Sequence, residues 1–249
     1  MNFQVTGAGE LIWQTGLFTR SKTTKFTLSN AEHTTGSKDR DKMLFFKLIL
    51  LVTAISFISY FLTTTIVDIA LMGRLDFYFS AKAMTKEFLI TKANRIDFQD
   101  GFKCSGFSSA FVMRHWNISV DGNSAYEKMP NKMRGGYVYP KGIFNFLSKN
   151  GFKVKYCRGN LNSLKNEVAT GNPVIAMIKI RPDKNWLHYV PVVGYDGQNI
   201  FIAESLAELS NCNEPHYNRR IPAKEFKKLW NTAMPKMPLY ANTFFTVER

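Results

Sequence analysis

The segment FQDGFKCSGFSSAF, residues 98–111, places Gln99 five residues before Cys104, which opens an apolar run. If a helix begins at Cys104, its first N–H groups and its dipole favour a thiolate over a thiol. A glutamine amide close to such a sulfur can help to stabilise an oxyanion. Small residues follow the cysteine, starting with Ser105, as a backbone that approaches a substrate requires. The segment therefore predicts a nucleophilic cysteine at a helix N-terminus.

Simpler interpretations of both residues stay open at this point. A cysteine in an apolar helix is often only a buried thiol that packs against its neighbours. Gln99 alone could equally be a solvated side chain in a loop. The two residues carry a chemical meaning only together, and only if a base lies nearby in the fold.

A candidate base follows in LHYVPVVGYD, residues 187–196, where His188 opens an apolar strand. An imidazole base needs a third group that fixes its tautomer. We expect Glu204 to be that group, because it lies in the next strand of a hairpin, where an unpaired carboxylate is costly. Asp196 is the alternative, although its place in Asp196-Gly197-Gln198 suits a turn.

The pattern of apolar residues and breakers over residues 94–249 predicts one α+β domain, with most of its helices before an antiparallel sheet. Pro140, Asn150-Gly151 and Gly171-Asn172-Pro173 mark helix ends. Helices are expected at 105–116, 124–129, 141–149, 161–170 and 223–230, and strands at 152–157, 174–180, 188–195, 199–203 and 242–247.

An uncharged apolar run, LILLVTAISFISYFLTTTIV, extends from Leu48 to Val67 and is long enough to cross a bilayer as a helix. Basic residues such as Lys42 and Lys47 precede it, and Asp68 follows it. The positive-inside rule then places the C-terminal domain outside the cell membrane, on a single-pass anchor. A cleaved signal that releases a secreted protein, and a buried core helix, are the alternatives.

These features divide the chain into four parts. Residues 1–42 are polar and are expected to form a disordered cytoplasmic leader. Residues 43–72 form the signal anchor, and residues 94–249 form the folded domain. Between them, residues 73–93 carry apolar side chains at helical spacing, which predicts either a juxtamembrane stalk or the first element of the domain.

The composition indicates a globular protein with a basic surface. Hydrophobic residues make up 45% and charged residues 21% of the chain, which excludes wholesale disorder. The 33 Lys and Arg against 19 Asp and Glu give a net charge of +14. These positive residues are scattered and form no recognition motif, so no nucleic-acid partner is expected, and an anionic membrane or wall surface is favoured.

The three cysteines, Cys104, Cys157 and Cys212, form neither a disulfide framework nor a metal-ligand pattern. Cys104 must stay free if it is a nucleophile. We expect Cys157 and Cys212 to be two unrelated buried thiols, with a disulfide between them as the alternative. No metal and no organic cofactor are predicted.

The residues Gln99, Cys104, His188 with the following YVPVVGYD, and Glu204 resemble the papain-like family of bacteriocin-processing, double-glycine leader peptidases, in its stand-alone branch. The resemblance covers residues 95–210 and implies a papain-like fold. It implies that Gln99 contributes to the oxyanion hole, that Cys104 attacks, that His188 is the base and that a carboxylate orients it.

The sequence departs from this family at two site positions. Ser105 stands where a glycine usually follows the cysteine, and Glu204-Ser205 replaces an Asp-Pro pair. No phosphate-loop motif of an ATPase occurs in the sequence, so leader cleavage coupled to export in the same chain is not implied.

The predicted function is a membrane-anchored thiol peptidase or amide hydrolase that acts on a peptide or protein. We expect Ser105, Trp186 and Tyr189 to contact the substrate, and Tyr137 and Tyr139 are candidates for the same cleft. A catalytically weak or inactive module that binds a peptide or cell wall is the alternative. Acyl transfer is a further one, because water and amines attack the same thioester.

Overall fold

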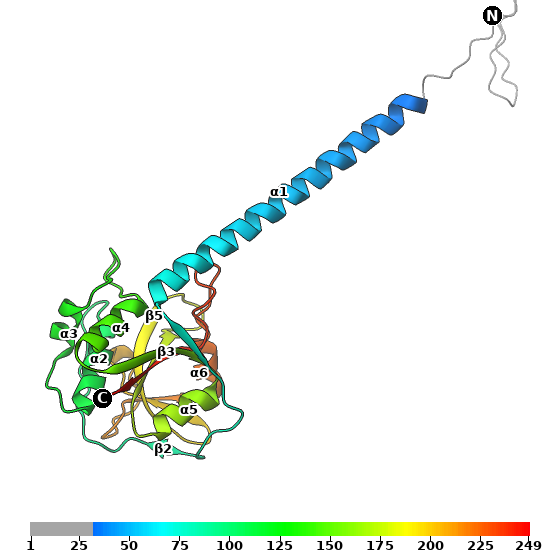
Figure 1. Ribbon diagram of the computed structural model, residues 1–249. Coiled ribbons are helices and arrows are strands. Elements are labelled where there is room, and N and C mark those ends of the chain that lie inside the picture. Colours follow the sequence, from blue (N-terminus) through cyan, green and yellow to red (C-terminus); the bar gives the residue numbers. More distant parts are fainter. Residues whose placement is uncertain (1–31) are drawn as a thin grey trace, which may run out of the picture. The chain divides into compact units, whose positions relative to one another are not determined.

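The computed structural model describes residues 32–249 (Figure 1). The chain divides into two compact units, Met1–Phe57 and Ile58–Arg249. Helix α1 (Glu32–Met72) contributes its residues up to 57 to the first unit and its residues from 58 to the second. The predicted disordered leader, residues 1–42, lies outside the described residues as far as residue 31. From Glu32 the prediction is wrong, because the chain is helical there.

Helix α1 contains the apolar run that the sequence singles out. The stretch from Lys38 to Met72 is long and apolar enough to cross a membrane, and none of the residues in its most apolar window is buried. This exposure contradicts the buried core helix, since a core helix hides its apolar side chains from water. Length and composition suit a membrane span and a signal sequence equally well.

A mixed sheet forms the centre of the second unit. Its strands follow the order β1-β3-β8-β4-β5-β6-β7, and β2 pairs with β5. The pairs are antiparallel except for β1 with β3, which are parallel. The strands are β1 (Leu75–Tyr78), β2 (Phe88–Leu89), β3 (Lys153–Gly159), β4 (Val174–Lys179), β5 (Leu187–Tyr195), β6 (Asn199–Ile202), β7 (Arg219–Pro222) and β8 (Thr243–Glu248).

Alternation along β4 shows how the sheet builds two cores. Ile175 and Met177 pack in one cluster with residues of α2 and α4, whereas Val174, Ala176 and Ile178 pack in another with residues of α5 and α6. Successive side chains of a strand point to opposite faces, so both faces of the sheet are covered. Figure 1 shows α2, α3 and α4 on one side of the sheet and α5 and α6 on the other.

Local signals place the helices close to where the sequence predicts them. They are α2 (Cys104–His115), α3 (Gly122–Lys128), α4 (Pro140–Lys149), α5 (Leu161–Ala169) and α6 (Ala223–Trp230), with a short 3₁₀ turn at Ala207–Leu209. Asp121 caps α3 by accepting from the N–H of Ser124, and Asn160 forms a capping box with Ser163 in α5. Pro140 opens α4, where its missing N–H is not needed.

The helical spacing expected over residues 73–93 is wrong. This segment forms β1 and β2 with extended chain between them, and β1 lies in the sheet beside β3. It is therefore the first element of the folded unit and not a stalk. Its backbone hydrogen-bond partners lie in strands that are distant in the sequence. The spacing of residues within the segment therefore cannot predict this pairing.

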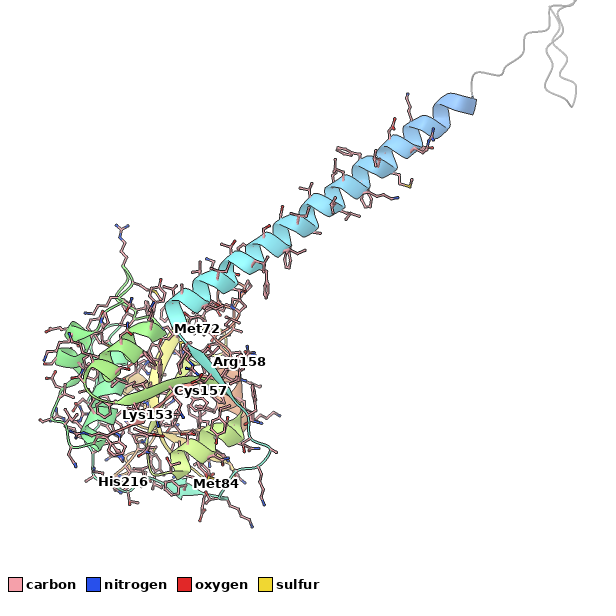
Figure 2. All side chains as sticks on the ribbon, in the orientation of Figure 1. Met72, Met84, Lys153, Cys157, Arg158 and His216 are labelled. Carbon is pink, nitrogen blue, oxygen red and sulfur yellow. The ribbon has the colours of Figure 1, made fainter. Side chains whose placement is uncertain are left out.

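The last turns of α1 are part of the second unit. Met72 is buried with the core residues of α2 and α4 and is labelled at the helix end in Figure 2. Asp68 is also buried, and its carboxylate accepts a hydrogen bond of 3.3 Å from the N–H of Leu239. Lys141 donates to the carbonyl of Ala70 over 3.4 Å. The apolar helix thus ends in contact with the folded sheet unit.

Candidate active site

Cys104 is the first residue of α2 and is buried, with 5% of its surface exposed. Gly101, at a φ of +62°, turns the chain before the helix, and Lys103 ties the turn to Asp100 and Asn123. No described side chain caps the N-terminus of α2. The first N–H groups of this helix are therefore available to a bound anion beside the sulfur.

His188 and Glu204 lie together, both buried, near the ends of β5 and β6. The imidazole Nε2 is 2.6 Å from Glu204 Oε1, and the side chain of Cys104 lies close enough to His188 to raise its pKa. The imidazole therefore lies between the thiol and the carboxylate. The hairpin of β5 and β6 produces this arrangement, because it brings residues that are sixteen positions apart side by side.

The charges of this buried pair shift both of its pKa values. Burial alone would lower the pKa of His188, but the Glu204 charge and the hydrogen bonds to Cys104 and Glu204 outweigh it and raise that pKa to about 10. Burial alone would raise the pKa of Glu204, but the charges of His188 and Arg219 and the N–H of Leu206 lower it to about 2. The two side chains therefore form a buried ion pair at neutral pH.

Arg219 and Asn218 hold Glu204 in place, and sequence reasoning missed both. Arg219 Nη1 donates to Glu204 Oε2 over 2.7 Å, and the N–H of Leu206 donates to Oε1 over 2.8 Å. The Asn218 amide accepts from the Glu204 N–H and donates to the Glu204 carbonyl. A buried carboxylate needs a cation, and Arg219-Arg220 directly before an apolar strand residue was the signal that could have pointed to one.

Gln99 is half-buried, and both ends of its amide are bonded. Its Oε1 accepts from the hydroxyl of Ser205 over 2.7 Å, and its Nε2 donates to the carbonyl of Gly101 over 2.7 Å. The Gln99 N–H also donates to the Ser205 carbonyl. Ser205 therefore orients the glutamine, leaving one N–H of Nε2 for a further acceptor.

A cavity of about 320 Å³ opens beside Cys104. Two of the three predicted substrate contacts, Trp186 and Tyr189, line it, and Tyr137 and Tyr139 line it as well. Ser105 is different: it is buried, its hydroxyl has no hydrogen-bond partner, and it is not part of the cavity wall. Ser105, which stands where the resembled family usually has a glycine, therefore affects the packing of α2 and not the cavity surface.

The structure places Asp196, His216 and the two remaining cysteines outside the group of Cys104, His188 and Glu204. The Asp196 carboxylate accepts hydrogen bonds from the N–H groups of Gln198 and Asn199, as a turn residue does, and its partners do not include His188. His216 lies at the far end of the folded unit from Met72 (Figure 2) and does not line the cavity. Cys157 is buried on β3, whereas Cys212 is only half-buried, and both thiols are free.

The comparison with family models identifies one match in this region. The model described as the Peptidase_C39 like family matches residues 92–236, which include Gln99, Cys104, His188 and Glu204. No curated protein matches the chain.

Solved structures of cysteine peptidases align with this chain. A C39-like peptidase from Bacillus anthracis aligns with a TM-score of 0.50 and 15% identity, over 66% of this chain and 98% of that one. The peptidase domain of Streptococcus ComA aligns at 0.49 and 15%, over 62% and 97%. A Carica candamarcensis cysteine protease in complex with E-64 aligns at 0.48 and 15%, over 67% and 99%. At this identity the first of these likenesses shows a common papain-like fold.

Proposed function

Because the chain belongs to the Peptidase_C39 like family, we propose that it is a cysteine peptidase with Cys104 as nucleophile, His188 as base and Glu204 as the residue that orients His188. The observation that carries the proposal is the position of the His188 imidazole, which contacts the Cys104 side chain and, through Nε2, the Glu204 carboxylate. A thiol, an imidazole and a carboxylate in this order are the parts of a nucleophilic triad.

The proposed reaction starts from the ion-pair state, in which the thiol proton already resides on His188. Glu204 stabilises the resulting imidazolium, in line with the raised pKa of His188. The sulfur of Cys104 then attacks the carbonyl carbon of a peptide bond. Negative charge on the carbonyl oxygen is stabilised by the N–H groups that begin α2 and by the free N–H of Gln99 Nε2. His188 protonates the leaving amine, and water hydrolyses the thioester.

The contact between Cys104 and His188 also bears on the alternative of an inactive binding module. A module of that kind would tolerate a wide or blocked gap between sulfur and imidazole. Here the Cys104 side chain lies close enough to the imidazole to raise the pKa of His188. This arrangement supports catalysis over binding alone.

We further propose that residues 43–72 anchor the enzyme in the membrane and that the sheet unit acts outside the cell on peptide or protein substrates. The apolar stretch of α1 and the basic residues before it support this placement. The same unit would be secreted if the segment were cleaved as a signal.

Peptide hydrolysis by the full chain in detergent micelles tests the proposal. With a mixed peptide library and mass spectrometry, the wild type is expected to generate cleavage products, Cys104→Ala none, and Cys212→Ala as many as the wild type. Addition of a small amine separates hydrolysis from acyl transfer, because transfer leaves the amine on the product. Equal cleavage by Cys104→Ala and the wild type would contradict the proposal.

A further inference from the structure

A second cavity lies where β3 ends and β8 begins, and it is separate from the one beside Cys104. Its volume is about 480 Å³, and the two cavities share no lining residue. Arg158 enters its wall from β3, and Lys227 and Trp230 enter from α6. Figure 2 labels Arg158 toward the end of β3 that is opposite to Lys153. Volumes of roughly 300–1,000 Å³ are typical of small-molecule sites, so this cavity is large enough for a ligand of its own.

The positive charge in this wall is not balanced by a negative one. Arg158 and Lys227 line the cavity, and none of the described residues that line it is acidic. Within the described part of the chain, neither of these two side chains takes part in a hydrogen bond or an ion pair. Arg158 is half-buried, whereas Lys227 is exposed. A partly desolvated guanidinium without an acidic partner favours a bound anion, so the wall selects a negatively charged group.

Asparagines make up the rest of the polar wall, namely Asn160, Asn162, Asn231 and Asn242. The side-chain amides of Asn231 and Asn242 bond to no described residue. Asn160, in contrast, accepts from the N–H of Ser163 and donates to the carbonyl of Ser80. A free amide offers both donors and an acceptor, which together suit the hydroxyl groups of a ligand. The wall therefore fits a ligand that carries hydroxyl groups beside its negative charge.

Hydrogen bonds fix the parts of this wall relative to one another. The N–H of Gly159 donates to the carbonyl of Asn242 over 3.0 Å, and the N–H of Asn242 donates to the carbonyl of Trp230 over 3.1 Å. The indole N–H of Trp230 donates to the carbonyl of Thr243 over 2.9 Å, so the buried ring closes the cavity and has no donor left for a ligand. These bonds connect β3, α6 and β8, and the cavity therefore exists before a ligand arrives.

We propose that this cavity binds a phosphate ester of a polyol or sugar, with the phosphate held by Arg158 and Lys227 and the hydroxyl groups by Asn231 and Asn242. A guanidinium donates two parallel N–H groups to a phosphate, and an ammonium adds a second positive charge. Two cations match a phosphate monoester, which carries a charge of about −1.5 to −2 at neutral pH, better than a carboxylate with its single charge. The site is independent of the proposed peptidase activity, because it shares no residue with the cavity beside Cys104.

Isothermal titration calorimetry of the full-length protein in uncharged detergent micelles tests the proposal, with glycerol phosphate as the probe. We expect saturable binding of glycerol phosphate, binding of glycerate that is weaker by roughly tenfold or more, and no binding of glycerol. Arg158→Gln and Lys227→Gln are each expected to weaken the binding of glycerol phosphate by roughly tenfold. Lys228→Gln changes an exposed lysine of α6 that does not line the cavity, and it is expected to bind as the wild type does.

Two further points make the outcome decisive. Lys227 is exposed, so Lys227→Gln still tests the site if Arg158→Gln does not fold. Nanodiscs at about 0.15 M salt, where surface charge is screened over about 8 Å, identify the source of the phosphate. Phosphatidylglycerol in place of phosphatidylcholine lowers the affinity for glycerol phosphate if a lipid headgroup fills the cavity, and leaves it unchanged if the ligand is a soluble ester.

Three results would overturn the proposal. They are no saturable binding of glycerol phosphate, binding of glycerate as tight as that of glycerol phosphate, and equal affinity of the wild type, Arg158→Gln and Lys227→Gln.

Discussion

At the scale of single residues, Glu204 is the best-supported side chain of the site. It is fully buried, and His188, Arg219 and the N–H of Leu206 all donate to its carboxylate. Glutamate is longer than the aspartate that the resembled family usually has. Its two oxygens serve different partners here, Oε1 the imidazole and Oε2 the guanidinium. Glutamate in place of aspartate at position 204 therefore comes with a second cationic partner, Arg219, beside His188.

The pKa values of this pair determine the pH range in which the pair itself contributes to stability. The pKa of Glu204 is lowered to about 2 from 4.5, so its contribution is present above 4.5 and is lost as the pH falls through about 2. The pKa of His188 is raised to about 10 from 6.5, so its contribution is present below 6.5 and is lost as the pH rises through about 10. Both contributions are complete between 4.5 and 6.5.

Arg219→Met is predicted to destabilise the protein and to move the acid loss of stability to higher pH. The variant leaves Glu204 Oε2 buried without its cation, which costs about 3–5 kcal/mol for a broken buried pair. Removing one of the charges that lower the pKa of Glu204 brings that pKa closer to 4.5. Urea unfolding between pH 2 and 7 measures both effects. Arg220→Met, at an exposed position next in sequence, is the control. If both variants lost stability over the same range of acid pH, the result would contradict the role of Arg219.

The residues of the site were predictable from sequence to different degrees. Cys104, His188 and Glu204 each follow a local signal: a helix start, the head of an apolar strand and a carboxylate in an apolar run. The structure brings these three together, and their catalytic roles stay a proposal. Arg219 was missed because its local signal is weak and its partner, Glu204, is brought close only by the pairing of Arg219 with Ile202 in the sheet. Burial of Ser105 was missed because the packing of α2 determines it.

At the scale of elements, the close packing of α2 against α3 fixes the position of the nucleophile. A Cβ on Gly106 would lie 2.4 Å from the carbonyl oxygen of Gly122 and 2.5 Å from Tyr126 Cβ. The helix that begins with Cys104 therefore approaches its neighbour more closely than any larger residue allows. The glycine positions the site, although it touches no substrate.

Gly106→Ala is predicted to lower the free energy of unfolding by about 1–3 kcal/mol, because the added methyl group forces α2 and α3 apart. The same shift moves Cys104 relative to His188, so peptide cleavage is expected to fall as well. Chemical denaturation and the cleavage assay measure the two effects. Gly197→Ala, where a Cβ meets nothing within 4 Å, is the matched control and is expected to stay within about 0.5 kcal/mol of the wild type. Equal stability of the two variants would argue against the packing account.

Helices and long strands were more predictable than short strands. The sequence prediction for α6 agrees with its bounds, Ala223–Trp230, and β3 to β5 agree to within a few residues. Strands β1, β2 and β7 were missed, and they have two to four residues each. These strands have little apolar pattern of their own, since partners elsewhere in the sheet stabilise them, whereas β6 is equally short but follows a clear turn signal.

At the scale of the whole molecule, the charge distribution around the apolar stretch predicts one orientation in the membrane. Lys42 and Lys47 precede the stretch and Asp68 follows it, so the C-terminal unit is expected outside the cell. A protease added to intact cells is expected to digest an epitope attached after Arg249. Replacement of the basic residues from Lys38 to Lys47 by glutamine is expected to protect that epitope in part of the molecules. Full protection of the epitope in the unaltered protein would contradict this orientation.

The reactivity of the three cysteines toward iodoacetamide at pH 6 tests the central claim most directly. Exposure alone predicts that the half-buried Cys212 reacts before Cys104 and Cys157, which are buried. A thiolate held by His188 predicts the opposite order, with Cys104 alkylated first. Located by mass spectrometry of tryptic peptides, the adduct is expected on Cys104 in the wild type, with that preference lost in His188→Ala. Alkylation of Cys212 before Cys104 in the wild type would contradict the assignment of Cys104 as the nucleophile.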